Sequence, residues 1–353
     1  MGTVYSDLKM FHYKEKLDSL PPGEAVTSPL HIRWNPTNRC NHRCNYCAYI
    51  KDLNIGRKMH TQDIISHEKM LEIAHDIVNM GVGAVSFSGG GEPLSHPHLL
   101  EACQILHSGG VKIACHTNGA LLKGEIAEFF AHNATWIRLS MDGWDDESYT
   151  RYRQVKDGEY TRIMQNMKDF VALGGECVLG VSLIIDAENA LFVFDSLRRL
   201  KEVGVNSVKT SVCIVSNDAA KNNAYHAPHF KLVQESIFNA KETLADETFE
   251  IMDSWHDMEE RFEKEYNWCP FSQIVPVIGA DLGVYTCHDM SYNELGLLGK
   301  LDNQSFMEFW MSGKEKFFRL DPSQHCTHHC AVNNKNRMLL DYLSADREHL
   351  AFV

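Results

Sequence analysis

The sequence predicts an α/β protein whose parallel sheet curves into a partial (β/α)6 barrel. Between residues 31 and 215, six short apolar runs alternate with segments whose apolar residues recur at helical spacing. Strands that alternate with helices pair in parallel, because the helix carries the chain back to the same edge of the sheet. Six repeats are too few for the usual closed barrel, so we expect an open one with its chemistry at the C-terminal strand ends.

Glycine and polar residues bound most of the expected strands, which are HIRWNP at 31–36, GAVSFSG at 83–89, VKIACHTNG at 111–119, TWIRLSMDG at 135–143, CVLGVSLII at 177–185 and SVKTSVCIV at 207–215. Helical periodicity is clearest in HEKMLEIAHDIVNM, HLLEACQILHS and ALFVFDSLRRLKEV. Glycines stand where C-terminal helix caps belong, at Gly81, Gly109, Gly174 and Gly204.

The pattern changes after residue 225, which predicts a second domain. A helix is expected around 229–244, followed by a cysteine-bearing region with a hairpin-like DLGVYTC segment. We therefore expect an N-terminal extension at 1–30, a barrel domain at 31–225 and a C-terminal domain at 226–353 that packs against it.

Charge and hydropathy exclude some partners. The chain has 34 basic and 47 acidic residues, and its net charge of -13 opposes the basic face that nucleic-acid binding requires. No apolar run approaches the ~18 to 20 residues of a membrane span, and the N-terminus does not resemble a signal peptide. We therefore expect a cytoplasmic protein that binds neither nucleic acid nor membrane.

Cys40, Cys44 and Cys47 form a tight group in TNRCNHRCNYCAY, directly after the first expected strand. Eleven cysteines in a chain without an export signal are more typical of metal binding than of disulfides. Three thiolates on a four-iron cube leave one iron without a protein ligand, and this iron can bind a small molecule. The alternative is a zinc loop that lacks its fourth ligand.

This group resembles the signature of the radical S-adenosylmethionine (SAM) superfamily, CxxxCxxC, with an aromatic residue, here Tyr46, before the last cysteine. The next strand ends in SFSGGGEPL, which resembles the family's Gly-Gly-Glu motif at Gly90, Gly91 and Glu92. Glycines let the backbone approach a ligand, and a carboxylate can accept hydrogen bonds from an ammonium group. The resemblance implies a 4Fe–4S cluster whose open iron binds SAM, an electron donor such as flavodoxin or ferredoxin, and cleavage of SAM to a 5′-deoxyadenosyl radical.

Further positions resemble the family's SAM contacts. Ser140 and Asp142 match positions that bind the ribose, and Asn118 is a neighbouring candidate, since these side chains can bond ribose hydroxyls. Arg153 in YTRYRQVKDGEY is implied to pair with the methionine carboxylate. Ile185 occupies a position that resembles the adenine contact, although the glycines often found around it are missing.

Strand parity predicts which side chains line the barrel. If Asn118 and Ser140 face inward, the two-residue period of a strand turns Cys115 toward the surrounding helices. The predicted inward set is Ser86, Ser88, His116, Asn118, Arg138, Ser140, Lys209, Ser211 and Cys213. An interior this polar predicts a pocket for a hydrophilic substrate.

A second cysteine group, Cys269, Cys287, Cys326 and Cys330, has the spacing C-x17-C-x38-C-x3-C. This spacing is too long for a compact zinc knuckle, but a folded domain can converge it on either zinc or an iron–sulfur cluster. The segments NWCPF, GVYTCHDM and HCTHHC resemble the SPASM and twitch auxiliary-cluster domains. Four cysteines suffice for one fully ligated auxiliary 4Fe–4S cluster, and the resemblance implies that it accepts or relays an electron.

These features together predict an oxidoreductase or epimerase that abstracts a carbon-bound hydrogen from a small polar substrate such as a sugar, amino sugar or cyclitol. Loss of an electron and a proton from the substrate radical would complete a dehydrogenation, whereas a hydrogen atom from a thiol would give an epimer. Cys213 is the candidate donor, and a small apolar filler is the alternative interpretation of this residue. Maturation of a ribosomally made peptide and a structural zinc or electron-transfer protein are the competing functions.

Overall fold

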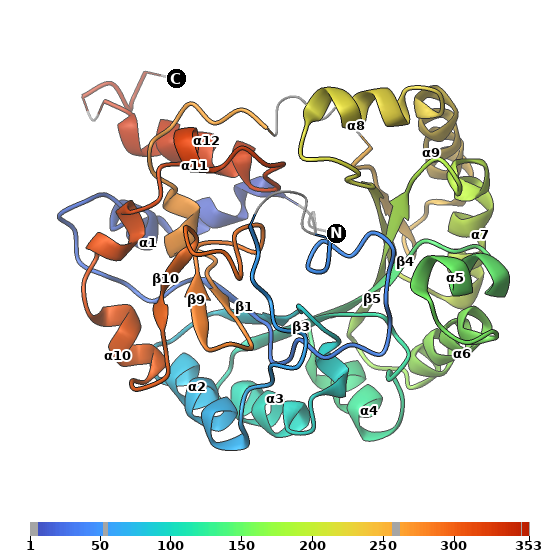
Figure 1. Ribbon diagram of the computed structural model, residues 1–353, viewed down its shortest axis with the longest axis horizontal. Coiled ribbons are helices and arrows are strands. Elements are labelled where there is room, and N and C mark those ends of the chain that lie inside the picture. Colours follow the sequence, from blue (N-terminus) through green and yellow to red (C-terminus); the bar gives the residue numbers. More distant parts are fainter. Residues whose placement is uncertain (1–5, 52–55, 256–261, 347, 353) are drawn as a thin grey trace.

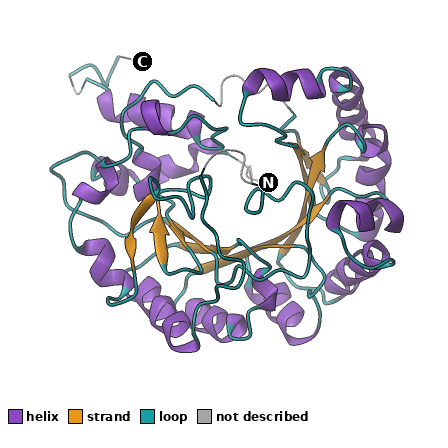
Figure 2. Cartoon of the chain, viewed as in Figure 1, coloured by secondary structure: helices purple, strands orange, loops and turns teal. Residues whose placement is uncertain are grey.

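The computed structural model describes residues 6–51, 56–255, 262–346 and 348–352. A single ten-stranded sheet, in the order β10-β9-β8-β1-β2-β3-β4-β5-β6-β7, forms the curved inner wall of an open barrel. Helices cover the outer face of this wall (Figure 1), and Figure 2 shows the strands inside the ring of helices. The expected α/β class and partial barrel are confirmed.

The strands are β1 (His31–Trp34), β2 (Ala84–Phe87), β3 (Lys112–Thr117), β4 (Trp136–Met141), β5 (Val178–Ile185), β6 (Ser207–Val212), β7 (Glu250–Met252), β8 (Val277–Ile278), β9 (Gly283–Tyr285) and β10 (Leu297–Lys300). The α-helices are α1 (Lys14–Asp18), α2 (His67–Asn79), α3 (Leu99–Ser108), α4 (Gly124–Asn133), α5 (Asp146–Arg153), α6 (Glu159–Ala172), α7 (Val193–Val203), α8 (Ala219–His226), α9 (Phe230–Leu244), α10 (Phe306–Met311), α11 (Pro322–His325) and α12 (Asn333–Ser344). Short 3-10 helices are η1 (Asp7–His12), η2 (Pro93–Ser95), η3 (Ala190–Phe192), η5 (Pro270–Gln273) and η6 (Glu315–Phe318).

All six strands expected from the sequence form, and they pair in parallel as β1 to β6. Two additions come from beyond residue 225, because β7 extends the sheet next to β6 while β8 pairs with β1 and continues into an antiparallel β8–β9–β10 meander. The C-terminal segment therefore shares the sheet with the barrel, and the domain division at 225 stays a prediction.

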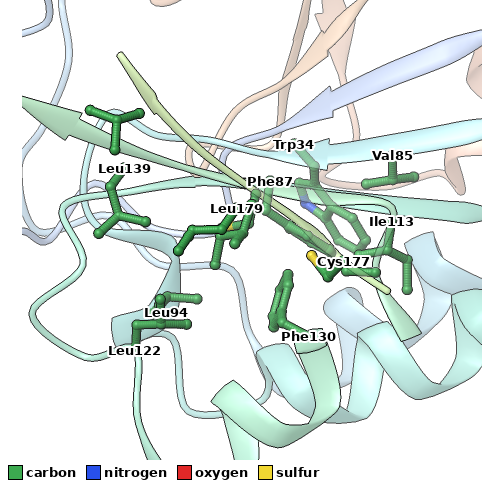
Figure 3. Packing of buried hydrophobic residues seen from close by; sticks show 14 of the residues in the cluster. Trp34, Val85, Phe87, Leu94, Ile113, Leu122, Phe130, Leu139, Cys177 and Leu179 are labelled. Carbon is green, nitrogen blue, oxygen red and sulfur yellow. The ribbon is translucent and has the colours of Figure 1, made fainter. Parts of the chain in front are cut away.

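The hydrophobic core lies between the sheet and the outer helices (Figure 3). Trp34 of β1 stacks on Phe87 of β2 with 5.3 Å between ring centroids, and both side chains are fully buried. Cys115 belongs to the same core, as strand parity predicts, so alternate residues of β3 face the opposite side. This packing holds the strand ends where the cysteine loop is attached.

The N-terminal extension packs against the C-terminal segment. Leu17 and Leu20 form a buried cluster with Ile274 and Leu339, and the Trp310 indole donates to the Thr27 carbonyl at 2.8 Å. None of the described helices combines the length and apolar composition needed to cross a lipid bilayer.

Candidate active site

Cys40, Cys44 and Cys47 lie in the loop that follows β1, and all three line one cavity of about 720 Å³ together with Gly90. The described lining contains no carboxylate but three basic side chains, Arg39, Arg43 and Lys51. The positive charge of these groups favours bound anions, including thiolates.

The cysteine loop is held by the C-terminal end of α5. The backbone N–H groups of Arg43 and Asn45 donate to the carbonyls of Arg153 and Tyr152, each at 2.9 Å. The Asn45 side chain adds a hydrogen bond to the Arg151 carbonyl at 3.0 Å. The YTRYRQ segment therefore positions the cysteines through its backbone, a role that its sequence did not indicate.

The Gly-Gly-Glu turn lies directly against the cysteine loop. A Cβ atom on Gly91 would lie 2.1 Å from the Arg39 carbonyl oxygen, and one on Gly90 would lie 2.2 Å from Asn38 Oδ1. The Glu92 N–H donates to the same Arg39 carbonyl at 2.9 Å. Glycine is required at Gly91 because the backbones of the two loops meet there, and at Gly90 because the Asn38 side chain fills the space beside it.

We expect Gly91→Ala to lower the free energy of unfolding by about 1–3 kcal/mol and to reduce iron bound at the cysteine loop, because its Cβ would push Arg39 away. Urea unfolding and iron content measure the two effects. Gly83→Ala is the control, since its Cβ would lie 3.2 Å from the Leu30 carbonyl oxygen, where a small shift relieves the contact. Equal losses in both variants would contradict this explanation.

Glu92 joins the ends of β2 and β3. Its carboxylate accepts from Thr117 Oγ1 at 2.6 Å, from Asn118 N–H at 2.7 Å and from Leu94 N–H at 3.1 Å, and burial raises its pKa. The Asn118 side chain in turn donates to Asn41 Oδ1 at 2.7 Å. Glu92 and Asn118 therefore connect two strand ends to the cysteine loop.

Arg153 and Asp142 form a buried ion pair. Arg153 Nε donates to both Asp142 oxygens at 3.0 and 3.1 Å, and the side chains are 3% and 1% exposed. Arg153 Nη1 lies 3.4 Å from Cys44 Sγ, and the guanidinium lies over the Tyr46 and Tyr149 rings. Asp142 thus binds Arg153, which differs from the expected ribose contact. The buried Arg153 Nη2 has no partner among the described residues and can bind an anion.

The structure also corrects the expectation for Ile185. This side chain is fully buried in the core on the helix side of the sheet. Val212, its register partner on β6, is partly buried against the same core. Ile184 faces the lumen instead, because successive side chains of a strand alternate. The Ile185 side chain therefore points away from the lumen, in which SAM would lie, whereas Ser140, half-buried beside Ser182, has the inward position that was expected.

Sequence reasoning missed several residues that support the site. Buried His42 contacts Glu159 with Nε2–Oε1 at 3.4 Å, and the Asn189 amide donates to the Asp142 carbonyl at 2.9 Å. Tyr292, from the C-terminal segment, donates to Asn38 Oδ1 at 2.6 Å beside Gly90. No local motif marks these residues, because each partner lies far along the chain.

The second cysteine group also converges. Cys269 precedes η5, Cys287 follows β9, and Cys326 and Cys330 flank the turn between α11 and α12. Burial, and then the neighbouring Cys287 thiol, raise the pKa of Cys269 to about 12, while burial followed by Asp289 raises those of Cys287 and Cys330 to about 12. Buried thiols with pKa values this high need a nearby cation to become thiolates.

Hydrogen-bond donors and a cationic side chain around this second site can stabilise negatively charged sulfur ligands. Asn336 Nδ2 lies 3.2 Å from Cys269 Sγ, and the buried Lys264 ammonium donates to the His328 carbonyl between Cys326 and Cys330. Burial lowers the pKa of Lys264, and the thiols oppose that shift. The residues present therefore fit a bound metal centre.

Arg57 links the loops that carry the two cysteine groups. Its guanidinium donates to the Ala48 carbonyl, next to Cys47, and to the Asp289 carbonyl at 2.7 Å, two residues after Cys287. The same guanidinium lies 5.2 Å from the centre of the Tyr49 ring. One side chain thus sets the relative position of both loops.

Comparison with known families decides the identity of the barrel. Residues 34–190, which contain the cysteine loop, the Gly-Gly-Glu turn and Arg153, match the Radical SAM superfamily. The chain carries a radical SAM domain. A radical SAM domain implies a 4Fe–4S cluster and SAM, and the expected resemblance to this superfamily is confirmed for these residues.

Curated relatives of the radical SAM domain include the GTP 3′,8-cyclase of Pseudomonas syringae pv. syringae, 28% identical over 48% of this chain and 51% of the relative. A probable GTP 3′,8-cyclase of Methanothermobacter thermautotrophicus is 28% identical over 52% of this chain and 59% of the relative. The matches thus span about half the length of these relatives.

Solved structures share the fold over most of the chain. Streptococcus suis SuiB bound to the precursor peptide SuiA aligns with a TM-score of 0.63 and 12% identity, over 94% of this chain and 78% of SuiB. Native anSMEcpe with bound AdoMet aligns with a TM-score of 0.61 and 16% identity, over 89% of this chain and 96% of anSMEcpe. At these identities the likeness establishes the fold alone.

Proposed function

We propose that this chain is a radical SAM enzyme that abstracts a carbon-bound hydrogen from a small polar substrate, giving dehydrogenation or epimerisation. A cluster held by Cys40, Cys44 and Cys47, together with SAM, supplies a 5′-deoxyadenosyl radical when bound. The observation that carries the proposal is the shared cavity of these cysteines, next to the unpaired Nη2 of buried Arg153. Formation of 5′-deoxyadenosine from SAM by the anaerobically reduced protein, with flavodoxin or ferredoxin as electron donor, tests it.

The residues present fit this cofactor pair. Burial, partly opposed by the His42 N–H group, raises the pKa of Cys40 to about 11, so its thiolate needs nearby positive charge. Arg153 Nη2 can donate to the methionine carboxylate in place of the missing protein partner. Asp142 holds the guanidinium in place for this contact.

For the second cysteine group we propose an auxiliary 4Fe–4S cluster. Sulfurs on a tetrahedral zinc lie about 3.8 Å apart, because each Zn–S bond is about 2.3 Å long. Among the described residues, no three of these cysteine sulfurs lie within 4.8 Å of one another. No three of these sulfurs therefore stand at the spacing of a preformed zinc site.

Cys213 is the proposed hydrogen donor if the reaction is an epimerisation. It follows β6 next to the lumen, and burial, with a smaller contribution from Asp186, raises its pKa to about 12. A high pKa keeps the group as S–H at neutral pH, which is the form that can give up a hydrogen atom. The thiyl radical left on Cys213 would return to the thiol by taking one electron from the electron donor and one proton from solvent.

In deuterated water, a product formed by epimerisation is expected to carry one deuterium at the reacting carbon, because the Cys213 thiol exchanges with solvent. Mass spectrometry measures this label. Cys213→Ala should abolish labelled product and still form 5′-deoxyadenosine, whereas Cys103→Ala, in the buried face of α3, should change neither. Unlabelled product would favour dehydrogenation instead.

Peptide modification is the second candidate function. The fold likeness to SuiB, solved with the precursor peptide SuiA, extends over 94% of this chain, and anSMEcpe has been solved with the Cp18Cys peptide. Formation of 5′-deoxyadenosine that rises with a peptide and not with small metabolites would favour this function.

A further inference from the structure

Positive charge gathers in the lumen of the barrel, although the whole chain carries a net charge of -13. Strands β1 to β6 contain no aspartate or glutamate. Residues of the opposite parity, such as Ile32 and Val208, pack in the core, so the charged positions face inward. The charged lumen side chains are Arg33, Arg138 and Lys209, and the neutral imidazoles of His31 and His116 lie on the same face.

Two of these side chains are aligned side by side. His116 and Arg138 are register partners on β3 and β4, and both contact Trp136, with the His116 ring 4.9 Å and Arg138 Cζ 5.3 Å from its ring centre. Gly180, the partner of Arg138 on β5, lies directly beside this side chain, since a Cβ there would be in ordinary contact with Arg138 Nε at 3.4 Å. The barrel wall thus presents a guanidinium and an imidazole together.

Arg33 supplies a further charge from β1. Its guanidinium forms no hydrogen bond and no ion pair with any residue in the described ranges, and only its backbone N–H donates, to the Pro276 carbonyl at 3.0 Å. Burial, and next the charge of Arg33, lower the pKa of His31 to about 3, and the same two causes lead the lowering of the His116 pKa. An arginine with no counter-charge in a partly buried lumen is unfavourable unless an anion occupies it.

The lumen is hollow beside His31 and Arg138, the strand neighbours of Arg33 and His116, which do not themselves line the cavity. A cavity of about 710 Å³ is lined by His31, Arg138, Lys209 and Lys335, and its one carboxylate among the described lining, Asp7, is paired with Lys335 at 3.2 Å. His116 and Arg138 stand two residues before Asn118 and Ser140, which is roughly 7 Å along a strand. The positive region therefore lies just below the strand ends proposed to hold SAM.

We propose that this lumen binds an oxyanion of the substrate, a carboxylate or a phosphate, through Arg33, His116 and Arg138. The inference deepens the proposed function and depends on it only for the identification of the ligand as substrate. It narrows the small polar substrate to an acid or a phosphate ester. Amino sugars and aminocyclitols without an acidic group would be repelled.

Calorimetric titration of the full-length, cluster-loaded protein tests the proposal, with inorganic phosphate and acetate as probes at constant ionic strength set by sodium chloride. At least one oxyanion is expected to bind, and Arg33→Gln to weaken its binding at least tenfold, since a charge-assisted hydrogen bond is lost. Arg33→Lys should retain most of the affinity. Arg198→Gln, at an exposed arginine of α7, should retain all of it. A preference for phosphate or acetate identifies the oxyanion.

Absence of binding by both probes, or equal binding by wild type and a folded Arg33→Gln variant, would overturn the proposal. If circular dichroism shows that Arg33→Gln is unfolded, Arg138→Gln takes its place with the same expected loss. Release of 5′-deoxyadenosine from SAM in the same preparation tests the proposed radical function separately from anion binding. Anion binding without SAM cleavage keeps the subsite and removes the radical function, and cleavage without anion binding does the reverse.

Discussion

Replacing Cys40, Cys44 and Cys47 together by alanine is expected to lower bound iron from about eight to about four atoms per chain and to abolish cleavage of SAM. These thiols line one cavity with Gly90 and with basic side chains, and no other described cysteine lines it. The loss should therefore be confined to one cluster. Iron, sulfide and zinc analysis after anaerobic preparation, with a parallel assay for 5′-deoxyadenosine, measures both effects.

Cys103→Ala is the matched control, because Cys103 is fully buried in the core. It should retain all of the iron. About four irons plus one zinc in the wild-type chain would keep the radical SAM site and exclude an auxiliary iron–sulfur cluster. A chain that contains no iron after anaerobic preparation would overturn both cluster sites.

Asp142→Ala is expected to lower the free energy of unfolding of the metal-free chain by about 3–5 kcal/mol. The substitution leaves the Arg153 guanidinium, 2% exposed as a residue, without the carboxylate that binds its Nε atom. Urea unfolding followed by circular dichroism gives the difference. Glu188→Ala removes an exposed partner of Arg151 and should change stability little, because solvent screens that pair.

The double variant Asp142→Ala/Arg153→Met separates stability from cofactor binding. Removing both charges should restore most of the lost stability, since an apolar side chain can fill the space of the pair. SAM binding should remain weak, because the guanidinium N–H group proposed for the methionine carboxylate is gone. A single Asp142→Ala variant as stable as wild type would show that the buried pair does not carry the expected energy.

Much of the fold follows from local sequence. The six parallel strands lie where the apolar runs were found, because a strand buried on its helix side needs its own apolar residues. The inward positions of His116 and Arg138 follow from strand parity, because successive side chains of a pleated strand point to opposite faces. The edge strands could not be predicted from the sequence, because β7 and β8 are only 3 and 2 residues long and form where neighbouring strands offer hydrogen bonds.

The sequence by itself determined the three-cysteine loop, the Gly-Gly-Glu turn and the radical SAM family, because these depend on spacing between near neighbours. Only the tertiary structure decided that Asp142 binds Arg153, that Ile185 faces the core, and that Arg33, His116 and Arg138 share the lumen. The physical reason is that a side chain's partner is chosen by distance in space. Residues on different strands that contact one another are not linked by any local sequence motif.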